Sequence, residues 1–251
     1  MTISHRLIGT GEHRVVVLHD WFGTTLGWGP FLDYLDGDTF SYALLDYRGY
    51  GERADVPGDY TLAEIAQDVL ALADGLGWER FSLVGHSMGA KAAQRVLVEA
   101  PHRIRRLAGV APVPASAYPL DADAHALFHG AAERPANRRA IIDLVTGRRA
   151  NGAWLDGMTA RSVAQSRPEA VEAYLTDWTT QDFAAKIAGS RLPVRVFIGE
   201  HDLALTEPVM QATWLSHYPD SSLEVLPNSG HYPMYELPVA FATALEDFLR
   251  D

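Results

Sequence analysis

Short apolar runs, rich in leucine or β-branched residues, alternate along this chain with longer stretches in which apolar residues recur at helical spacing. The short runs predict strands at residues 15–18, 42–45, 81–84, 107–111, 194–198 and 223–226. Strands that alternate with helices are typical of parallel sheets covered by helices. The pattern therefore predicts an α/β fold with a mostly parallel central sheet flanked by helices.

Three helices around this sheet have clear sequence signals. The segment Thr61 to Glu64 (TLAE) is a capping box and predicts a helix that runs to about Leu76. Residues 88–100 have helical spacing of apolar positions. The last helix is predicted to begin near Pro238, a residue suited to a first turn, and to pack its apolar stripe on the sheet.

The stretch between the predicted strands 107–111 and 194–198 has helical periodicity and no strand pattern. We predict that residues 117–185 form a helical insertion over the active edge of the sheet. Residues 1–116 and 186–251 are then the two parts of one core domain, as expected for an α/β chain of this length.

Large apolar residues are candidates to line a substrate pocket under this insertion. They are Phe22 in the loop after the first predicted strand and, within the insertion, Phe128, Trp154, Met158, Tyr174 and Trp178. For any one residue of the insertion, a place in the insertion's own small core is the commoner outcome. Only the group as a whole indicates an apolar pocket.

The composition is that of a globular protein, with 47% hydrophobic and 21% charged residues among 251. The formal net charge of −11 makes nucleic acid a poor partner, because a phosphate backbone would mostly be repelled. One group of arginines is predicted to lie on a solvated helix face. Its members are Arg134, Arg138, Arg139, Arg148 and Arg149.

The chain contains no cysteine, which excludes disulfides and thiolate metal sites. The sequence contains no metal-ligand spacing such as H-E-x-x-H, and no dinucleotide-binding motif follows a predicted strand. No metal and no cofactor are therefore expected. The first residues lack the apolar core of a secretory signal, and no apolar run has the length of a membrane span. We therefore expect a cytoplasmic protein without a membrane partner.

The most informative motif is Gly85 to Gly89 (GHSMG), a G-x-S-x-G placed between a predicted strand and a predicted helix. A serine attacks a carbonyl well only if its oxygen is presented clear of the backbone, and a sharp turn flanked by glycines does this. Ser87 is the candidate nucleophile. The following helix points its free N–H groups at the oxyanion that would develop.

A serine nucleophile needs a base, and the base needs an orienting carboxylate. Asp202 and His231 follow the predicted strands 194–198 and 223–226. Segments just beyond parallel strands lie along one edge of a sheet, so these side chains can converge with Ser87. Glu200 is the competing carboxylate beside Asp202.

With the chain order Ser, Asp, His and the DYRGYG stretch at 46–51, the sequence resembles the α/β-hydrolase superfamily over nearly its whole length. Residues 230–238 (GHYPMYELP) are similar to the family's histidine segment. The resemblance implies a serine carboxylesterase-like member with a helical cap. In it Ser87 is the nucleophile, His231 the general base and then acid, and Asp202 the residue that orients His231.

The resemblance also implies an oxyanion hole formed by the N–H groups of Met88 and Trp21. Trp21 lies in the loop His19 to Gly23 (HDWFG), which departs from the family pattern at Asp20, where glycine is usual. Aspartate tolerates left-handed backbone better than most residues, so the loop can keep its shape. We expect the Asp20 carboxylate to cap this loop and to point away from the site.

These observations predict a serine hydrolase that cleaves a small, fairly apolar carboxylic ester, aryl esters included, through an acyl-serine intermediate. Serine at the elbow excludes, by resemblance, the family's dehalogenases and epoxide hydrolases, which attack with aspartate. Three alternatives stay open: hydrolysis of a C–C bond or an enol-lactone in aromatic degradation, perhydrolysis, and a non-catalytic ligand receptor on the same fold.

Overall fold

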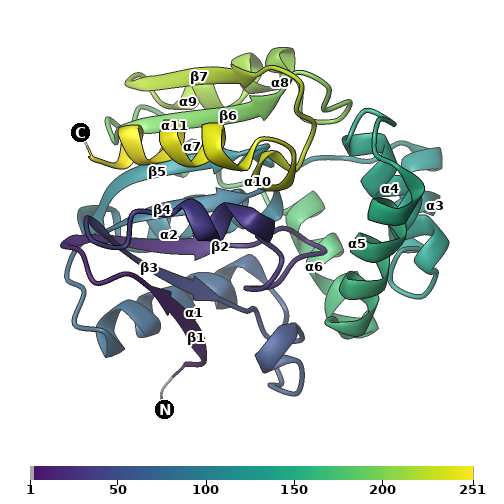
Figure 1. Cartoon of the computed structure of the whole chain (residues 1–251), viewed down its shortest axis with the longest axis horizontal. Coiled ribbons are helices and arrows are strands. Elements are labelled where there is room, and N and C mark those ends of the chain that lie inside the picture. Colours follow the sequence, from purple (N-terminus) through teal and green to yellow (C-terminus); the bar gives the residue numbers. More distant parts are fainter. Residues whose placement is uncertain (1–2, 251) are drawn as a thin grey trace.

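The computed structural model describes residues 3–250 and is built around a seven-stranded sheet in the order β1-β3-β2-β4-β5-β6-β7 (Figure 1). The strands are β1 (His5–Ile8), β2 (His13–Leu18), β3 (Phe40–Leu45), β4 (Phe81–His86), β5 (Ile104–Val110), β6 (Val194–Gly199) and β7 (Ser221–Leu226). All neighbouring strands described are parallel except β1 and β3. The predicted α/β fold with a mostly parallel sheet is confirmed.

All six predicted strands are present in the structure. Five of them lie wholly inside a strand, and the prediction 107–111 extends one residue beyond β5. Strand β1 was not predicted. It is four residues long, lies at the edge of the sheet and has two exposed central residues, with His5 opposite Leu45 of β3. A strand so short and so exposed carries no alternation of apolar and polar positions for a pattern to detect.

Helices cover both faces of the sheet. Helices α1 (Leu62–Gly75) and α2 (Met88–Glu99) pack together on one face, while α11 (Pro238–Arg250) lies on the other (Figure 1). The Thr61 hydroxyl accepts a hydrogen bond from the Glu64 N–H at 3.2 Å, which is one of the two bonds of a capping box, while the Glu64 carboxylate accepts from the N–H groups of Asp59 and Tyr60 at 3.2 and 3.1 Å. The shorter elements are η1 (Gly29–Tyr34), η2 (Gly51–Arg53), η3 (Pro101–Arg103), α8 (Glu207–Ala212), α9 (Trp214–His217) and α10 (Pro233–Glu236).

Between β5 and β6 the chain forms helices only. They are α3 (Ala122–His129), α4 (Pro135–Val145), α5 (Gly152–Ala164), α6 (Pro168–Thr180) and α7 (Ala184–Ile187). Helices α3 to α6 lie together beyond the carboxyl ends of the parallel strands, at the right of Figure 1. No helix within residues 3–250 combines the length and the apolar character needed to cross a membrane.

The prediction of a solvated arginine face is wrong for Arg138 on α4, which is only 1% exposed. Its guanidinium donates to the Ala131 carbonyl at 2.6 Å and to the hydroxyls of Ser162 and Ser166 at 2.9 and 2.7 Å. It also lies 5.6 Å from the centre of the Phe22 ring. Acceptors brought together by the fold satisfy this buried charge, and helical periodicity alone does not reveal them.

Lys91 fastens the helical segment between β5 and β6 to α2. Its side chain is fully buried, and the ammonium donates to the carbonyls of Ser116, Trp178 and Gln181 at 2.8, 2.7 and 2.7 Å. Three N–H donors thus meet three acceptors. Burial lowers the pKa of Lys91 to about 8, against the opposing effect of Asp177. The lysine therefore joins both ends of this segment to the helix that begins after Ser87.

Replacing Lys91 by methionine should lower the free energy of unfolding by about 2–4 kcal/mol, because three backbone carbonyls lose their donor. Chemical denaturation with far-UV circular dichroism measures this change. The matched control is Lys186→Met, since Lys186 is the only other lysine of the chain and is exposed on α7. Equal stability of the two variants would contradict the role given to Lys91.

Candidate active site

Ser87 lies at the sharp turn between β4 and α2, with φ of 54° and ψ of −118°. This backbone conformation is rare for a residue other than glycine and is typical of a strained functional position. A Cβ atom on Gly85 would lie 2.4 Å from Ala90 Cα, and one on Gly89 would lie 2.4 Å from the His19 carbonyl oxygen. The two glycines therefore allow the close packing that presents the serine.

His231 and Asp202 form a short, buried hydrogen bond. Asp202 follows β6, His231 follows β7, and the Nδ1 atom of His231 lies 2.6 Å from Oδ2 of Asp202. The two residues are 5% and 3% exposed. The other Asp202 oxygen accepts from the N–H groups of Ala204 and Leu205 at 2.9 and 3.0 Å. The carboxylate is thus aimed at the imidazole by its own loop.

The charges of this pair support one another. Burial favours neutral Asp202, but the imidazole and the two backbone N–H groups hold the pKa of Asp202 below its ordinary value. Burial likewise favours neutral His231, and the Asp202 carboxylate outweighs burial and raises the pKa of His231. The site is therefore built to stabilise an imidazolium at His231.

Glu200, the competing carboxylate, does not reach His231 in this structure. It is exposed, accepts from the Asn228 N–H at 3.0 Å and lies 3.6 Å from Nε2 of His201. The geometry therefore brings Asp202 to the imidazole and leaves Glu200 at the surface.

Ser87 and His231 line the same cavity. Within residues 3–250 no hydrogen bond joins the Ser87 hydroxyl to the imidazole. Hydrogen bonds between catalytic groups are often long without substrate and tighten when the substrate binds. The three residues singled out in the sequence thus meet at one place, with the His231–Asp202 contact already formed.

The rest of the cavity wall is almost entirely apolar. Besides Ser87, His231 and Asp20 it is formed by Trp21, Phe22, Met88, Val113, Tyr118, Phe128, Ile141, Val145, Trp178, Ala204, Leu205 and Tyr232. Trp21 stacks on Phe22 and Phe128, with ring centres 4.3 and 5.7 Å away, and meets the edge of Trp178 at 6.1 Å. Phe22, Phe128 and Trp178 are thus placed at the cavity, as the sequence led us to expect.

Three other candidates for the pocket lie elsewhere. Trp154 lines a separate surface groove beside Tyr235, and Met158 lines a small neighbouring cavity. Tyr174 is fully buried against the rings of Tyr47 and Tyr50, at 6.0 and 5.7 Å. Helical spacing shows which positions share a face, but it does not show what that face packs against.

The N–H groups of Trp21 and Met88 are both available beside Ser87. Both residues line the cavity, and neither backbone N–H has a hydrogen-bond partner within the described part of the chain, residues 3–250. The Trp21 side chain is fixed separately, since its indole N–H donates to the Val171 carbonyl at 2.9 Å. This pair of free donors is the arrangement an oxyanion requires.

His19 holds the loop that carries Trp21. Its Nδ1 lies 2.7 Å from the Asp20 carbonyl oxygen, its Nε2 is 3.3 Å from the Tyr47 N–H, and its ring stacks on Tyr47 at 3.8 Å. These contacts require a proton on Nδ1 and none on Nε2. Burial lowers the pKa of His19, which favours this neutral form.

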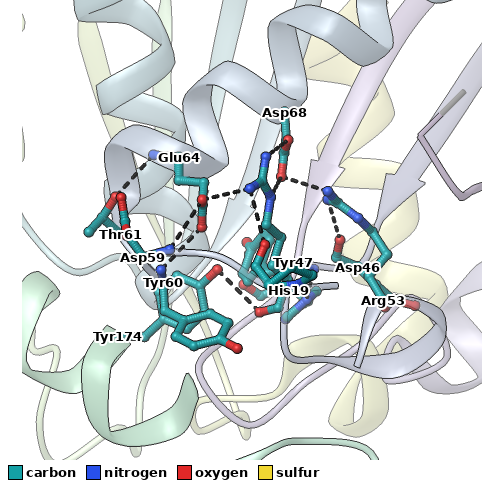
Figure 2. Close-up of polar contacts among 12 residues, drawn as sticks. His19, Asp46, Tyr47, Arg53, Asp59, Tyr60, Thr61, Glu64, Asp68 and Tyr174 are labelled. Carbon is teal, nitrogen blue, oxygen red and sulfur yellow. Dashed lines mark hydrogen bonds and ion pairs between the residues drawn. The ribbon is translucent and has the colours of Figure 1, made fainter. Parts of the chain in front are cut away.

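The DYRGYG stretch at 46–51 proves to be a structural anchor for this loop (Figure 2). Arg48 and Arg53 both donate to the Asp68 carboxylate on α1, at 2.9 and 2.8 Å, and Arg48 also donates to Glu64 at 2.7 Å. Tyr47 is thereby held against His19. Although this segment contributes to the family resemblance, its side chains do not line the cavity with Ser87.

Asp20 caps its own loop but does not turn away from the catalytic residues. Its Oδ2 accepts from the Phe22 N–H at 3.4 Å and from the Tyr232 hydroxyl at 3.1 Å. Its Oδ1 lies 3.7 Å from Nδ1 of His86. The prediction that the Asp20 carboxylate caps this loop is therefore correct. The prediction that it points away from the site is wrong, because the carboxylate faces the residues beside His231.

Glu236 and His86 were not assigned functional positions from the sequence. Both Glu236 oxygens accept from the Gly230 N–H at 2.9 Å, and one accepts from the Tyr232 N–H at 3.2 Å. Nε2 of His86 lies 2.8 Å from the His231 carbonyl oxygen. These contacts fix the backbone on both sides of the imidazole. Only the likeness of residues 230–238 to a family segment hinted at Glu236.

Among residues 3–250, no group of three or more histidine and carboxylate side chains is placed to hold a metal ion.

Comparison with known proteins agrees with this geometry. The model of the alpha/beta hydrolase family matches residues 15–244. A component of an acetoin cleaving system from Cupriavidus necator, a dihydrolipoyllysine-residue acetyltransferase, is 35% identical over 105 residues, which span 42% of this chain and 28% of that relative. The pimeloyl-[acyl-carrier protein] methyl ester esterase of Serratia marcescens is 27% identical over 262 residues, covering 96% of each chain.

Among solved structures, the enol-lactonase from Burkholderia xenovorans LB400 superposes with a TM-score of 0.85 at 21% identity, covering 99% of this chain and 96% of the other. At this identity the likeness shows the shared fold. Together with the family match, it accounts for nearly the whole chain.

Replacing Asp202 by asparagine should lower the pKa of His231, because the neutral amide no longer stabilises the imidazolium. An NMR titration of the imidazole resonances measures this shift. Glu200→Gln is the matched control and should leave the titration unchanged, since Glu200 does not contact His231. A larger shift in Glu200→Gln than in Asp202→Asn would reverse the assignment of the two carboxylates.

Proposed function

Because the chain belongs to the alpha/beta hydrolase family, we propose that it is a serine hydrolase of small, apolar carboxylic esters, aryl esters included, acting through an acyl-Ser87 intermediate. One observation carries the proposal. Ser87, the His231–Asp202 pair and the free N–H groups of Trp21 and Met88 converge on a single apolar cavity.

In the first half of the reaction, the Ser87 hydroxyl attacks the ester carbonyl and its proton passes to Nε2 of His231. Asp202 stabilises the resulting imidazolium, while the N–H groups of Trp21 and Met88 bind the oxyanion. The C–O bond to the alcohol then breaks, and the imidazolium gives its proton to the leaving oxygen. An acyl-Ser87 ester remains.

In the second half, water attacks the acyl carbonyl and gives a proton to His231. Collapse of the tetrahedral intermediate breaks the bond to Ser87, and the imidazolium returns its proton to the serine oxygen. The products are a carboxylic acid and the regenerated enzyme. Each step uses the same imidazole, which explains why its tautomer and backbone are held so firmly.

The cavity wall supports an uncharged substrate. Its residues include no lysine or arginine that could pair with a carboxylate, and its aromatic cluster suits an alkyl or aryl group. The cavity measures about 60 Å³, whereas a cavity that binds benzene has about 150 Å³. A small acyl group is therefore the part of the substrate that this space suits best.

We assign to residues 117–185 the role of a cap over this cavity, with residues 1–116 and 186–251 as the catalytic core. Phe128, Ile141, Val145 and Trp178, all from the helices between β5 and β6, contribute to the wall. Substrate range then depends on these residues, while the catalytic groups come from the core.

The Serratia relative is named as a methyl ester esterase, which supports an ester as substrate. The fold shared with an enol-lactonase supports the cyclic ester as a second candidate, since the same groups can open a lactone. A wall without lysine or arginine favours the neutral ester over a carboxylated lactone or a carboxylated ring-cleavage product.

Ser87→Ala should reduce hydrolysis of p-nitrophenyl esters by more than about a thousandfold, because the nucleophile is lost. Mass spectrometry after rapid mixing should show an acyl adduct on the wild-type protein and none on the variant. Full activity in Ser87→Ala, together with an absent adduct in the wild type, would end the proposal.

A substrate panel separates the ester from its competitors. We expect the highest kcat/KM with short-chain nitrophenyl or phenyl esters, because the cavity is small and apolar. A dienoate ring-cleavage product and an enol-lactone, each bearing a carboxylate, are compared under the same conditions. A higher kcat/KM for either of these than for every neutral ester would replace the proposed substrate class.

A further inference from the structure

Asp20, His86 and Tyr232 form a second carboxylate–imidazole arrangement next to the His231–Asp202 pair. The three residues are 6%, 2% and 2% exposed. Asp20 accepts from the Tyr232 hydroxyl at 3.1 Å and lies 3.7 Å from His86, whose other ring nitrogen is 2.8 Å from the His231 carbonyl oxygen. The rings of His86 and His231 are 4.9 Å apart.

The carboxylate of Asp20 keeps its charge in this buried position. Burial works against ionisation, but the contacts with His86, together with the fields of His19 and His231, lower the pKa of Asp20 to about 2. The side chain therefore stays ionised throughout the neutral pH range. It is a fixed negative charge in a cavity wall whose other residues, apart from Ser87 and His231, are mostly apolar.

Asp20 has no permanent positive charge beside it in the cavity wall, since His231 must be neutral to accept the Ser87 proton. The cavity lining contains neither lysine nor arginine. Arg138 lies 5.6 Å from the centre of the Phe22 ring, but it is bound to Ala131, Ser162 and Ser166 and does not line the cavity. A second negative charge that entered with a substrate would meet Asp20 in a medium of low polarity.

We propose that Asp20 is a specificity-determining residue, whose buried charge between His86 and Tyr232 restricts the enzyme to esters without a carboxylate on the acyl chain. The inference rests on the proposed ester hydrolase function and adds to it the residue that sets charge selectivity. Two like charges about 8 Å apart at an effective dielectric constant of about 20 repel enough to weaken binding about thirtyfold.

The test compares p-nitrophenyl pentanoate with mono-p-nitrophenyl glutarate, two esters of equal acyl length that differ by a terminal carboxylate. The wild-type protein should prefer the neutral ester by about thirtyfold in kcat/KM. Asp20→Asn keeps an oxygen for the N–H of Phe22 and the hydroxyl of Tyr232. It should reduce the preference at least tenfold, mainly by raising kcat/KM for the glutarate.

Two further variants separate charge from structure. Asp38→Asn changes the net charge equally at an exposed turn before β3 and should keep the wild-type preference. Asp20→Ser, neutral and still able to accept from Phe22, replaces Asp20→Asn if thermal unfolding shows that the latter does not fold.

The outcomes distinguish this inference from the function on which it rests. A wild-type protein that hydrolyses both esters equally well, or a folded neutral variant that keeps the full preference, overturns the role of Asp20 and leaves the ester hydrolase intact. A wild-type protein that hydrolyses neither ester overturns the function, and the selectivity with it.

Discussion

The close approach of α2 to the end of β2 at Gly89 is the constraint on which the rest of the site depends. A Cβ at this position would lie 2.4 Å from the carbonyl oxygens of Leu18 and His19, so any side chain would push the two segments apart. One segment carries Ser87 and Met88, and the other leads directly to Trp21. Their contact is what puts Ser87 and the N–H groups of Trp21 and Met88 on one cavity. The stack of His19 on Tyr47 supports the loop that follows β2. The contacts of Arg48 and Arg53 with Asp68, drawn in Figure 2, fix the segment that carries Tyr47.

Buried cations and buried carboxylates stabilise different parts of the site. Cations position the helices between β5 and β6: Lys91 and Arg138 bind backbone carbonyls and hydroxyls there. Carboxylates position the histidine segment, where Asp202 meets the imidazole and Glu236 meets the neighbouring N–H groups. Since Lys91 and Arg138 each have their own partners, neither is left to pair with a ligand in the cavity. The cavity wall between these helices and the histidine segment can therefore be mostly apolar, and this agrees with an uncharged substrate.

The sequence was enough to predict the sheet and the meeting of Ser87, Asp202 and His231, because both follow from local rules. A glycine-flanked serine between a strand and a helix predicts a sharp turn, and residues that follow parallel strands lie along one edge of the sheet. Edge strand β1 is short and exposed, so it has no alternation of apolar and polar positions that would predict it. Trp154, Tyr174 and Arg138 could not be placed, since their surroundings come from distant segments. Lys91 is the clearest case: its three acceptors are carbonyls, which every residue has and no sequence pattern marks.

Two residues of the cavity wall are also bonded to the segments that carry the proposed catalytic groups. Val145, at the end of α4, lines the cavity, and its carbonyl accepts the N–H of His231 at 3.1 Å. Phe22 likewise lines the cavity while its N–H contacts Asp20. A substitution that reshapes the wall at either residue therefore also acts on the segment that carries His231 or on the loop that carries Trp21. Phe128 and Trp178 also contact this loop, because their rings pack against Trp21 at 5.7 and 6.1 Å. Ile141 on α4 lines the cavity without a hydrogen bond to that segment or loop, so its substitution should change the wall with less effect on either of them.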